Sequence, residues 1–192
     1  MPSPQQAKAD FMYVFFGAND AVLPDSPTGQ HVPLHEYYQN LELILHDPAV
    51  TTHHPRLILI TPPPINEYQL QFVDFDKGYG GLTRKAEITC QYANACRELG
   101  ERLKVPVLDL WSAMMATTGW RDGETLVGSK DAPRNAKLDS LLADGLHFLP
   151  PAYKILYDEL MKLIKEQWPD QQPEETSFRL PAWTDAPKIT LS

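Results

Sequence analysis

Short apolar runs alternate with longer amphipathic stretches along this chain. The runs are almost continuously hydrophobic, and they occupy Phe11–Phe16, Leu57–Thr61 and Val105–Leu110. Runs of this kind are typical of strands whose two faces are both covered by helices. They predict the strands of a parallel sheet.

Hydrophobic positions spaced three and four residues apart predict a helix after each run. The third such pattern follows Pro150–Pro151, a pair that favours the start of a helix. The alternation of strands and helices predicts an α/β fold with right-handed crossovers and a mostly parallel sheet. The patterned positions are Leu34, Tyr37, Tyr38, Leu41, Ile44 and Leu45 in the first stretch, Ile88, Tyr92, Ala95, Cys96, Leu99 and Leu103 in the second, and Leu156, Leu160, Leu163 and Ile164 in the third.

The remaining sequence divides the chain into one domain with two flanking segments. Residues 1–10 are polar, and residues 169–192 are rich in proline and polar side chains, so the predicted domain spans residues 11–168. Within it, Pro62–Leu82 and Gly119–Ser140 show no periodicity. We expect both to be long loops, which in compact domains are commonly functional.

Composition narrows the class of protein. The 192 residues are 43% hydrophobic and 22% charged, which indicates a globular domain rather than a disordered chain. The net charge of −8 and the lack of a basic stripe argue against nucleic acid and anionic membranes as partners. No apolar run approaches the ~20 residues of a spanning helix, and residues 1–10 lack the apolar core of a signal peptide. Cys90 and Cys96 face opposite sides of a predicted helix, so we expect reduced thiols and a cytoplasmic protein.

Two short motifs lie where functional groups collect at the carboxyl edge of a parallel sheet. In Gly17–Asp20, Gly17 permits a sharp turn and Asn19 can offer an amide donor, although the segment also fits an ordinary turn. In Asp144–His147, the carboxylate can accept a hydrogen bond from Nδ1 of the imidazole and leave Nε2 to act as a base. The alternative for His147 is a residue that caps or packs on the following helix.

No metal or cofactor site is expected from the sequence. His31 and His35 are four residues apart, but Pro33 lies between them and no glutamate separates them as in a zinc-binding helix. Gly78–Gly81 is rich in glycine but does not follow a strand, and the chain contains no dinucleotide or Walker-type glycine motif.

Taken together, the two motifs resemble sequence blocks of the SGNH, or GDSL-type, hydrolases. Further segments are similar to the isoamyl acetate-hydrolysing esterase group of that family, and they occur in the family's order. The similar segments are FFGANDA at Phe15–Ala21, QHVPL at Gln30–Leu34, ITPPP at Ile60–Pro64, VPVLDLWSAM at Val105–Met114 and DGLHF at Asp144–Phe148.

The resemblance implies a flavodoxin-like three-layer α/β/α fold, truncated at its amino terminus, that cleaves short-chain acyl esters without a metal or cofactor. It implies that His147 is the general base and that Asp144 is its orienting carboxylate. Asn19 would donate its side-chain amide to an oxyanion hole, Gly17 would shape that loop, and Asp20 would hold the turn. The expected ligand is a small acyl ester.

The Gly-Asp-Ser block of the family has no counterpart in this sequence, and none of the serines matches a nucleophile motif. Three functions stay open: a weak or inactive esterase chain, a non-catalytic binding protein, and a half-enzyme completed by a chain that carries the serine. Since the absent strands would have flanked Phe11–Phe16, we expect that uncharged strand to be an exposed edge through which the chain self-associates.

Overall fold

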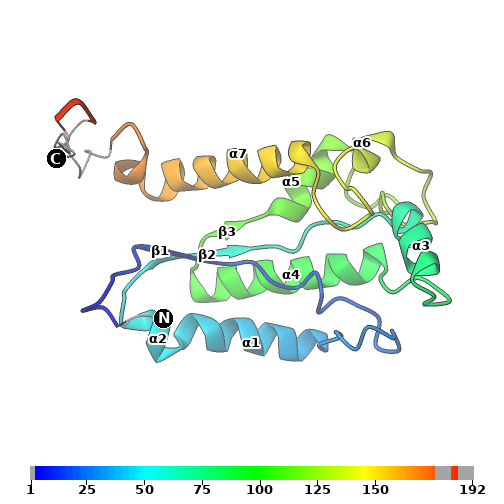
Figure 1. The fold of residues 1–192 in the computed structure, drawn as a ribbon, viewed down its shortest axis with the longest axis horizontal. Helices are drawn as coiled ribbons and strands as arrows, with labels where there is room; N and C mark the ends of the chain where they lie inside the picture. Colours follow the sequence, from blue (N-terminus) through cyan, green and yellow to red (C-terminus); the bar gives the residue numbers. More distant parts are fainter. Residues whose placement is uncertain (1–2, 176–182, 186–192) are drawn as a thin grey trace, which may run out of the picture.

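The computed structural model describes residues 3–175 and 183–185. Its centre is a parallel sheet of three strands, β1 (Phe11–Val14), β2 (Arg56–Ile60) and β3 (Val107–Leu108), in the order β1-β2-β3. The strands point towards the end of the molecule where most of the long connections lie (Figure 1). The predicted α/β fold with a parallel sheet is therefore confirmed.

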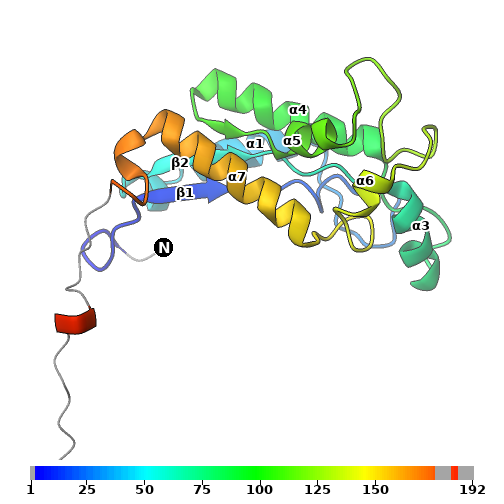
Figure 2. The same ribbon diagram turned by 90° about the horizontal axis from the view of Figure 1, so that it is seen from above.

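Helices cover both faces of this sheet, so the domain has three layers (Figures 1 and 2). On one face lie α1 (Leu34–His46) and α4 (Ala86–Leu103), and on the other lie α5 (Leu110–Thr117) and α7 (Pro150–Gln167). The helices α1, α4 and α7 occupy the three stretches in which the hydrophobic spacing predicts helices.

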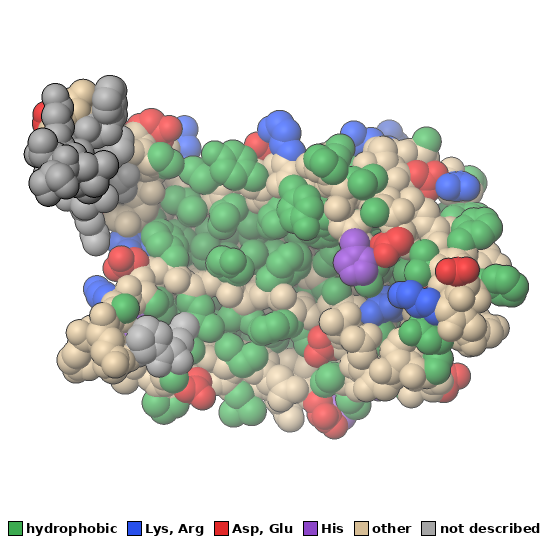
Figure 3. All heavy atoms as spheres, viewed as in Figure 1, with side chains coloured by type: hydrophobic (Ala, Val, Ile, Leu, Met, Phe, Trp, Pro, Cys, Tyr) green, Lys and Arg blue, Asp and Glu red, His purple; other side chains and the backbone are tan. Residues whose placement is uncertain are grey.

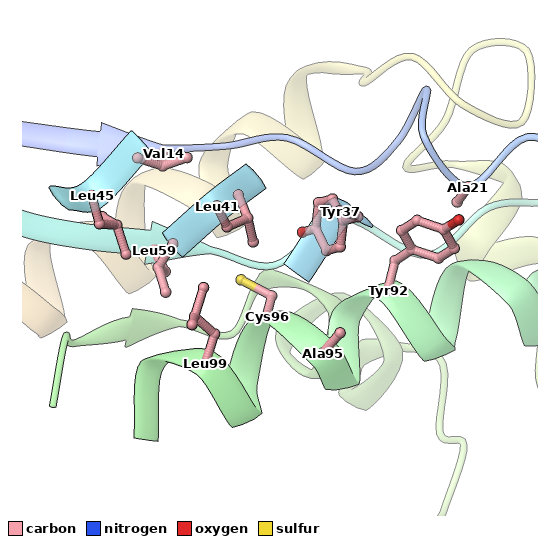
Figure 4. Packing of buried hydrophobic residues seen from close by; sticks show 10 residues of the cluster. All are labelled: Val14, Ala21, Tyr37, Leu41, Leu45, Leu59, Tyr92, Ala95, Cys96 and Leu99. Atoms are coloured by element: carbon pink, nitrogen blue, oxygen red, sulfur yellow. The ribbon is translucent and has the colours of Figure 1, made fainter. Parts of the chain in front are cut away.

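Two hydrophobic cores, one on each face of the sheet, explain why β2 is apolar without interruption. Successive side chains of a strand point to opposite faces. Leu59 therefore packs against α1 and α4, whereas Ile58 and Ile60 pack against α5 and α7. Figure 4 shows the first core, whose labelled members are Val14, Ala21, Tyr37, Leu41, Leu45, Leu59, Tyr92, Ala95, Cys96 and Leu99.

Both stretches predicted to be loops contain a helix. α3 (Glu67–Asp76) lies within Pro62–Leu82, and the short α6 (Ala136–Asp139) lies within Gly119–Ser140. The hydrophobic pattern missed α3 because its burial is inverted. Its phenylalanines at positions 72 and 75 are exposed, while its acidic residues at positions 67 and 74 are buried and accept hydrogen bonds from backbone N–H groups.

The third strand is shorter than predicted. Only Val107–Leu108 of the predicted strand Val105–Leu110 pairs with β2. Asp109 ends the strand because its carboxylate accepts a hydrogen bond from the Ser112 N–H and so caps α5. Leu110 therefore begins a helix.

β1 is an edge strand that is fully covered on one face and only partly covered on the other. Val14 is buried beneath α1, but Tyr13 is 64% exposed and Phe16, just beyond the strand, is 57% exposed. On the face seen in Figure 3, hydrophobic side chains gather over the region between α7 and α1, along this edge. An exposed edge, as predicted for Phe11–Phe16, is thus part of the structure.

The short elements complete the fold. α2 (Pro48–Thr51) follows α1, and two 3₁₀ turns, η1 (Pro169–Gln171) and η2 (Trp183–Asp185), occur in the predicted C-terminal segment. Residues 176–182 and 186–192 of that segment lie outside the described residues.

Two further features concern the cysteine thiols and the length and hydrophobicity of the helices. Cys90 is half-buried, Cys96 is buried, and both are free thiols. Among the described residues, no helix combines the length and the apolar character needed to cross a membrane.

Candidate active site

The loop after β1 presents Asn19 through a tight turn. Gly17 has a φ of +113°, and a Cβ atom there would lie 3.0 Å from Pro62 Cγ and from the Tyr37 hydroxyl. The Gly17 N–H donates to Asp20 Oδ2 at 3.2 Å, so the Asp20 carboxylate closes the turn. Glycine is required here both for the backbone conformation and for the space.

The turn before α7 brings Asp144 and His147 together. His147 Nδ1 lies 2.7 Å from Asp144 Oδ2, and Asp144 Oδ1 accepts the backbone N–H groups of His147 at 2.8 Å and Leu146 at 3.1 Å. The His147 side chain is 72% exposed, and its Nε2 has no hydrogen-bond partner in the described part of the chain. The structure thus contains the carboxylate–imidazole pair in which Nε2 is left open as a base.

The carboxylate of this pair is stabilised in its ionised form. Burial raises the pKa of Asp144, but the backbone and side-chain hydrogen bonds from His147, together with the N–H of Leu146, outweigh burial and hold the pKa below its usual value. A negative Asp144 at neutral pH keeps the proton of the imidazole on Nδ1.

The N-terminus of α3 anchors this turn. Gly145 has a φ of +90°, and a Cβ there would lie 2.4 Å from the Asn66 carbonyl oxygen and 2.8 Å from the Leu70 nitrogen. The Asn66 N–H donates to the Gly145 carbonyl at 2.9 Å. The glycine therefore lets the Asp144–His147 turn lie directly against the backbone of α3.

Two cavities meet at Asn19, Leu146 and His147, which line both. One, of about 310 Å³, is largely apolar and extends from Phe15 and Phe16 towards α7. The other, of about 300 Å³, is polar and extends towards the C-terminal end of α3. The amide of Asn19 and the imidazole of His147, predicted as partners from separate motifs, therefore border the same open space.

Sequence reasoning missed one residue of this region, Arg84. Its guanidinium is buried, lines the polar cavity and donates to Asn19 Oδ1 at 3.2 Å. Hydrophobic periodicity does not report on a buried cation, and a single arginine between Thr83 and Lys85 matches no catalytic motif, so no sequence signal pointed to it.

The other candidate chemistry is not brought to this site. His31 Nδ1 lies 2.6 Å from the Val22 carbonyl oxygen, and His35 Nε2 lies 3.9 Å from Glu36 Oε1. Within the described residues, no three His, Cys, Asp or Glu side chains gather as metal ligands. Neither cavity is lined by a described serine, so the described residues supply no nucleophile of that type.

The fold and the site define the class of this protein: a three-layer α/β/α domain with a carboxylate–histidine pair and an amide at the carboxyl edge of its sheet. A profile of the GDSL-like Lipase/Acylhydrolase family matches residues 1–155, and the chain belongs to this family. It is 37% identical to a GDSL esterase/lipase of Arabidopsis thaliana over 80% of this chain and 58% of that protein. It is 34% identical to the isoamyl acetate-hydrolyzing esterase 1 homolog of Mus musculus over 93% of this chain and 64% of that protein.

Solved structures agree with the family. The lipase/acylhydrolase of Enterococcus faecalis matches with a TM-score of 0.55 and 26% identity, over 82% of this chain and 62% of that one. Axe2, an acetylxylan esterase of Geobacillus stearothermophilus, shares the fold with a TM-score of 0.56 and 20% identity, over 85% and 63% of the two chains. The chain thus spans about 60% of the length of the curated relatives it matches.

Proposed function

We propose that this chain is the base-bearing part of an ester hydrolase that acts on small acyl esters. His147 is the general base, Asp144 holds its ring, and Asn19 donates to the oxygen that becomes negative in the transition state. The observation that carries the proposal is the 2.7 Å contact between His147 Nδ1 and Asp144 Oδ2, beside an apolar cavity of about 310 Å³ that Asn19 also lines.

The nucleophile in this proposal is a serine of a polypeptide segment outside the 192 residues. The edge of the sheet supports it, because among residues 3–175 and 183–185 β1 pairs only with β2, so that its other side is open for another strand. Phe16 lines one cavity towards α7 and another towards α1, so the apolar surface continues across the edge. A strand with its own covering helices would bury this surface.

In the proposed reaction these groups act together with the external serine. His147 Nε2 removes the proton of the serine hydroxyl as the serine oxygen attacks the ester carbonyl. The carbonyl oxygen gains the negative charge beside the Asn19 amide, and the Asp144 carboxylate stabilises the imidazolium. His147 returns the proton to the leaving alcohol, and a water molecule releases the acid by the same two proton transfers.

A second candidate is a non-catalytic protein that binds small acyl esters. It is favoured by one observation, that no described serine lines either cavity around His147. The two candidates differ in turnover, because a binding protein would retain an ester without cleaving it.

Complementation tests the proposal. The chain alone should hydrolyse p-nitrophenyl acetate barely above background, since loss of the nucleophile of a serine triad costs on the order of 10⁶ in kcat. Joined to the part of a full-length relative that these residues do not match, it should show turnover that a serine-directed phosphonate abolishes.

His147→Ala in the joined protein should abolish that turnover, and Asp144→Asn should lower it by about 10⁴, by analogy with serine proteases. Exposed His35→Ala is the matched control and should leave the rate unchanged. A joined protein whose turnover survives His147→Ala would refute the assignment, and saturable phosphonate-sensitive turnover by the unjoined chain would refute the external nucleophile.

Cytoplasmic localisation is the remaining part of the proposal. It is supported by two free thiols, which persist in reducing compartments. Fractionation of cells that express the untagged protein should place it with cytosolic markers.

A further inference from the structure

Arg84 is a buried cation whose donors converge on the loop that carries Asn19. The residue is 6% exposed. Its Nε donates to the Ala18 carbonyl at 3.0 Å, its Nη2 donates to Asn19 Oδ1 at 3.2 Å, and its Nη1 donates to Thr83 Oγ1 at 3.4 Å. Two consecutive residues of the candidate oxyanion loop are therefore held by one guanidinium.

The guanidinium is linked to α3 through the Thr83 hydroxyl, which accepts its Nη1 hydrogen bond. The Thr83 N–H and hydroxyl both donate to Asp74 Oδ2, at 2.7 and 2.9 Å. An isolated antiparallel bridge joins Arg84 to Val22, and the Leu23 N–H donates to the Thr83 carbonyl at 2.9 Å. The backbone around Arg84 is thus fixed by α3 and by the segment that follows Asn19.

Within the described residues, no carboxylate lies close enough to Arg84 to form an ion pair. Burial lowers the pKa of Arg84, against the opposing influence of Asp74, Asp144 and Tyr79. Burying a cation without a paired carboxylate is unfavourable for folding alone. The Nε and Nη2 hydrogen bonds of Arg84 go to the Asn19 loop, which points to a role in placing that loop.

The chemistry of the two side chains makes this contact directional. An amide offers an oxygen that accepts and a nitrogen that donates, whereas a guanidinium only donates. A charge-assisted hydrogen bond therefore favours the orientation with Oδ1 towards Arg84 by about 10- to 100-fold over the flipped one. Asn19 Nδ2 is left on the side away from Arg84, and it donates to no group in the described part of the chain.

We infer that Arg84 is a positioning residue that keeps the N–H donors of Asn19 directed at the space in front of His147, where the ester oxygen becomes negative. The inference deepens the proposed function and its catalytic consequence rests on it. The orientation of the amide, by contrast, is a property of this chain by itself and is measured without turnover.

The test is the NMR spectrum of the ¹³C,¹⁵N-labelled full chain, in which loss of signals in Asn19→Ser assigns the Asn19 side chain. In Arg84→Met, the Asn19 Cγ signal should move upfield and the Nδ2 signals towards those of a free amide. Arg84→Lys, which retains one cation but not the fork, should shift them part of the way. Arg97→Met is the matched control, because Arg97 pairs with Asp109 and stacks on Trp111 outside the site.

A folded Arg84→Met or Arg84→Lys chain with the wild-type Asn19 signals would overturn the inference, and Arg84→Lys keeps it testable if the methionine variant does not fold. In the joined enzyme, Arg84→Met should lower kcat by up to about 10²–10³ with little change in KM, and Arg84→Lys should restore part of it. A joined wild-type enzyme without turnover contradicts the proposed function, while the NMR signals still decide the role of Arg84.

Discussion

Replacing Gly145 by alanine tests how the Asp144–His147 turn is held against α3. The added methyl group meets two obstacles: a φ of +90°, and backbone atoms of Asn66 and Leu70 at 2.4 and 2.8 Å. The left-handed conformation costs an L-residue about 1–2 kcal/mol. Overpacking against backbone that cannot rotate away adds about 1–3 kcal/mol. We expect Gly145→Ala to lower the free energy of unfolding by about 2–5 kcal/mol, a large part of the usual 5–15 kcal/mol.

Urea unfolding measures this loss, and Gly123→Ala separates its two parts. Gly123 has a nearly equal φ of +85°, but nothing lies within 4 Å of its Cβ position. Its replacement should therefore cost only the conformational part, about 1–2 kcal/mol. With a urea dependence of about 2 kcal/mol per M, the Gly145→Ala midpoint should fall by about 1–2.5 M and that of the control by at most about 1 M. Equal losses in the two variants would refute the close approach of the turn to α3.

Three further predictions concern the surface, the thiols and the pH dependence. At about 100 μM the wild-type chain should associate through its open edge and scatter light as a dimer or a larger species. Tyr13→Lys should reduce this association, whereas Phe72→Lys, at a similarly exposed position on α3, should not. A wild-type chain that is a monodisperse monomer would contradict the prediction. Burial raises the pKa of both thiols, and it raises that of Cys96 to about 12. A thiol reagent at pH 8 should therefore modify the half-buried Cys90 first and Cys96 only on unfolding, and two rapidly reacting thiols would be inconsistent with the fold. The lowered pKa of Asp144 stabilises the fold at pH values above the unfolded-state pKa of about 3.9, and this stabilisation is lost as the pH falls through the lower pKa of the folded state. Asp144→Asn should therefore flatten the acid limb of the curve of unfolding free energy against pH. Parallel curves for the wild type and the variant would contradict this prediction.

Hydrophobic spacing predicted the three strands and the three long helices, but it missed α3, whose burial is partly polar, and the short apolar helix α5. The strand at Arg56–Ile60 and the helix at Ala86–Leu103 were predictable because their buried positions are hydrophobic. The helix at Glu67–Asp76 was not, since Glu67 and Asp74 face inwards and the exposed positions carry phenylalanine. Burial of a carboxylate there depends on N–H groups from distant segments, which no local pattern encodes.

In the candidate site too, some contacts could be predicted from the sequence and others could not. The residues of the Gly17–Asp20 and Asp144–His147 motifs lie close together in the chain, so the contact of the Gly17 N–H with Asp20 and that of Asp144 with His147 could be expected from the sequence. The contact of Arg84 with Asn19 joins positions 65 residues apart through the fold. It became visible only when the loop after β1 and the start of α4 were placed side by side.

The central claim is that Asn19 and His147 face the same reacting ester. The most direct measurement is a crystal structure of the joined protein after reaction with a phosphonate, whose tetrahedral phosphorus mimics the transition state. The account predicts the phosphonyl oxygen about 2.7–3.1 Å from Asn19 Nδ2 and the serine oxygen within hydrogen-bond reach of His147 Nε2. A phosphonate attached elsewhere, or one whose oxygen contacts neither residue, would contradict the account.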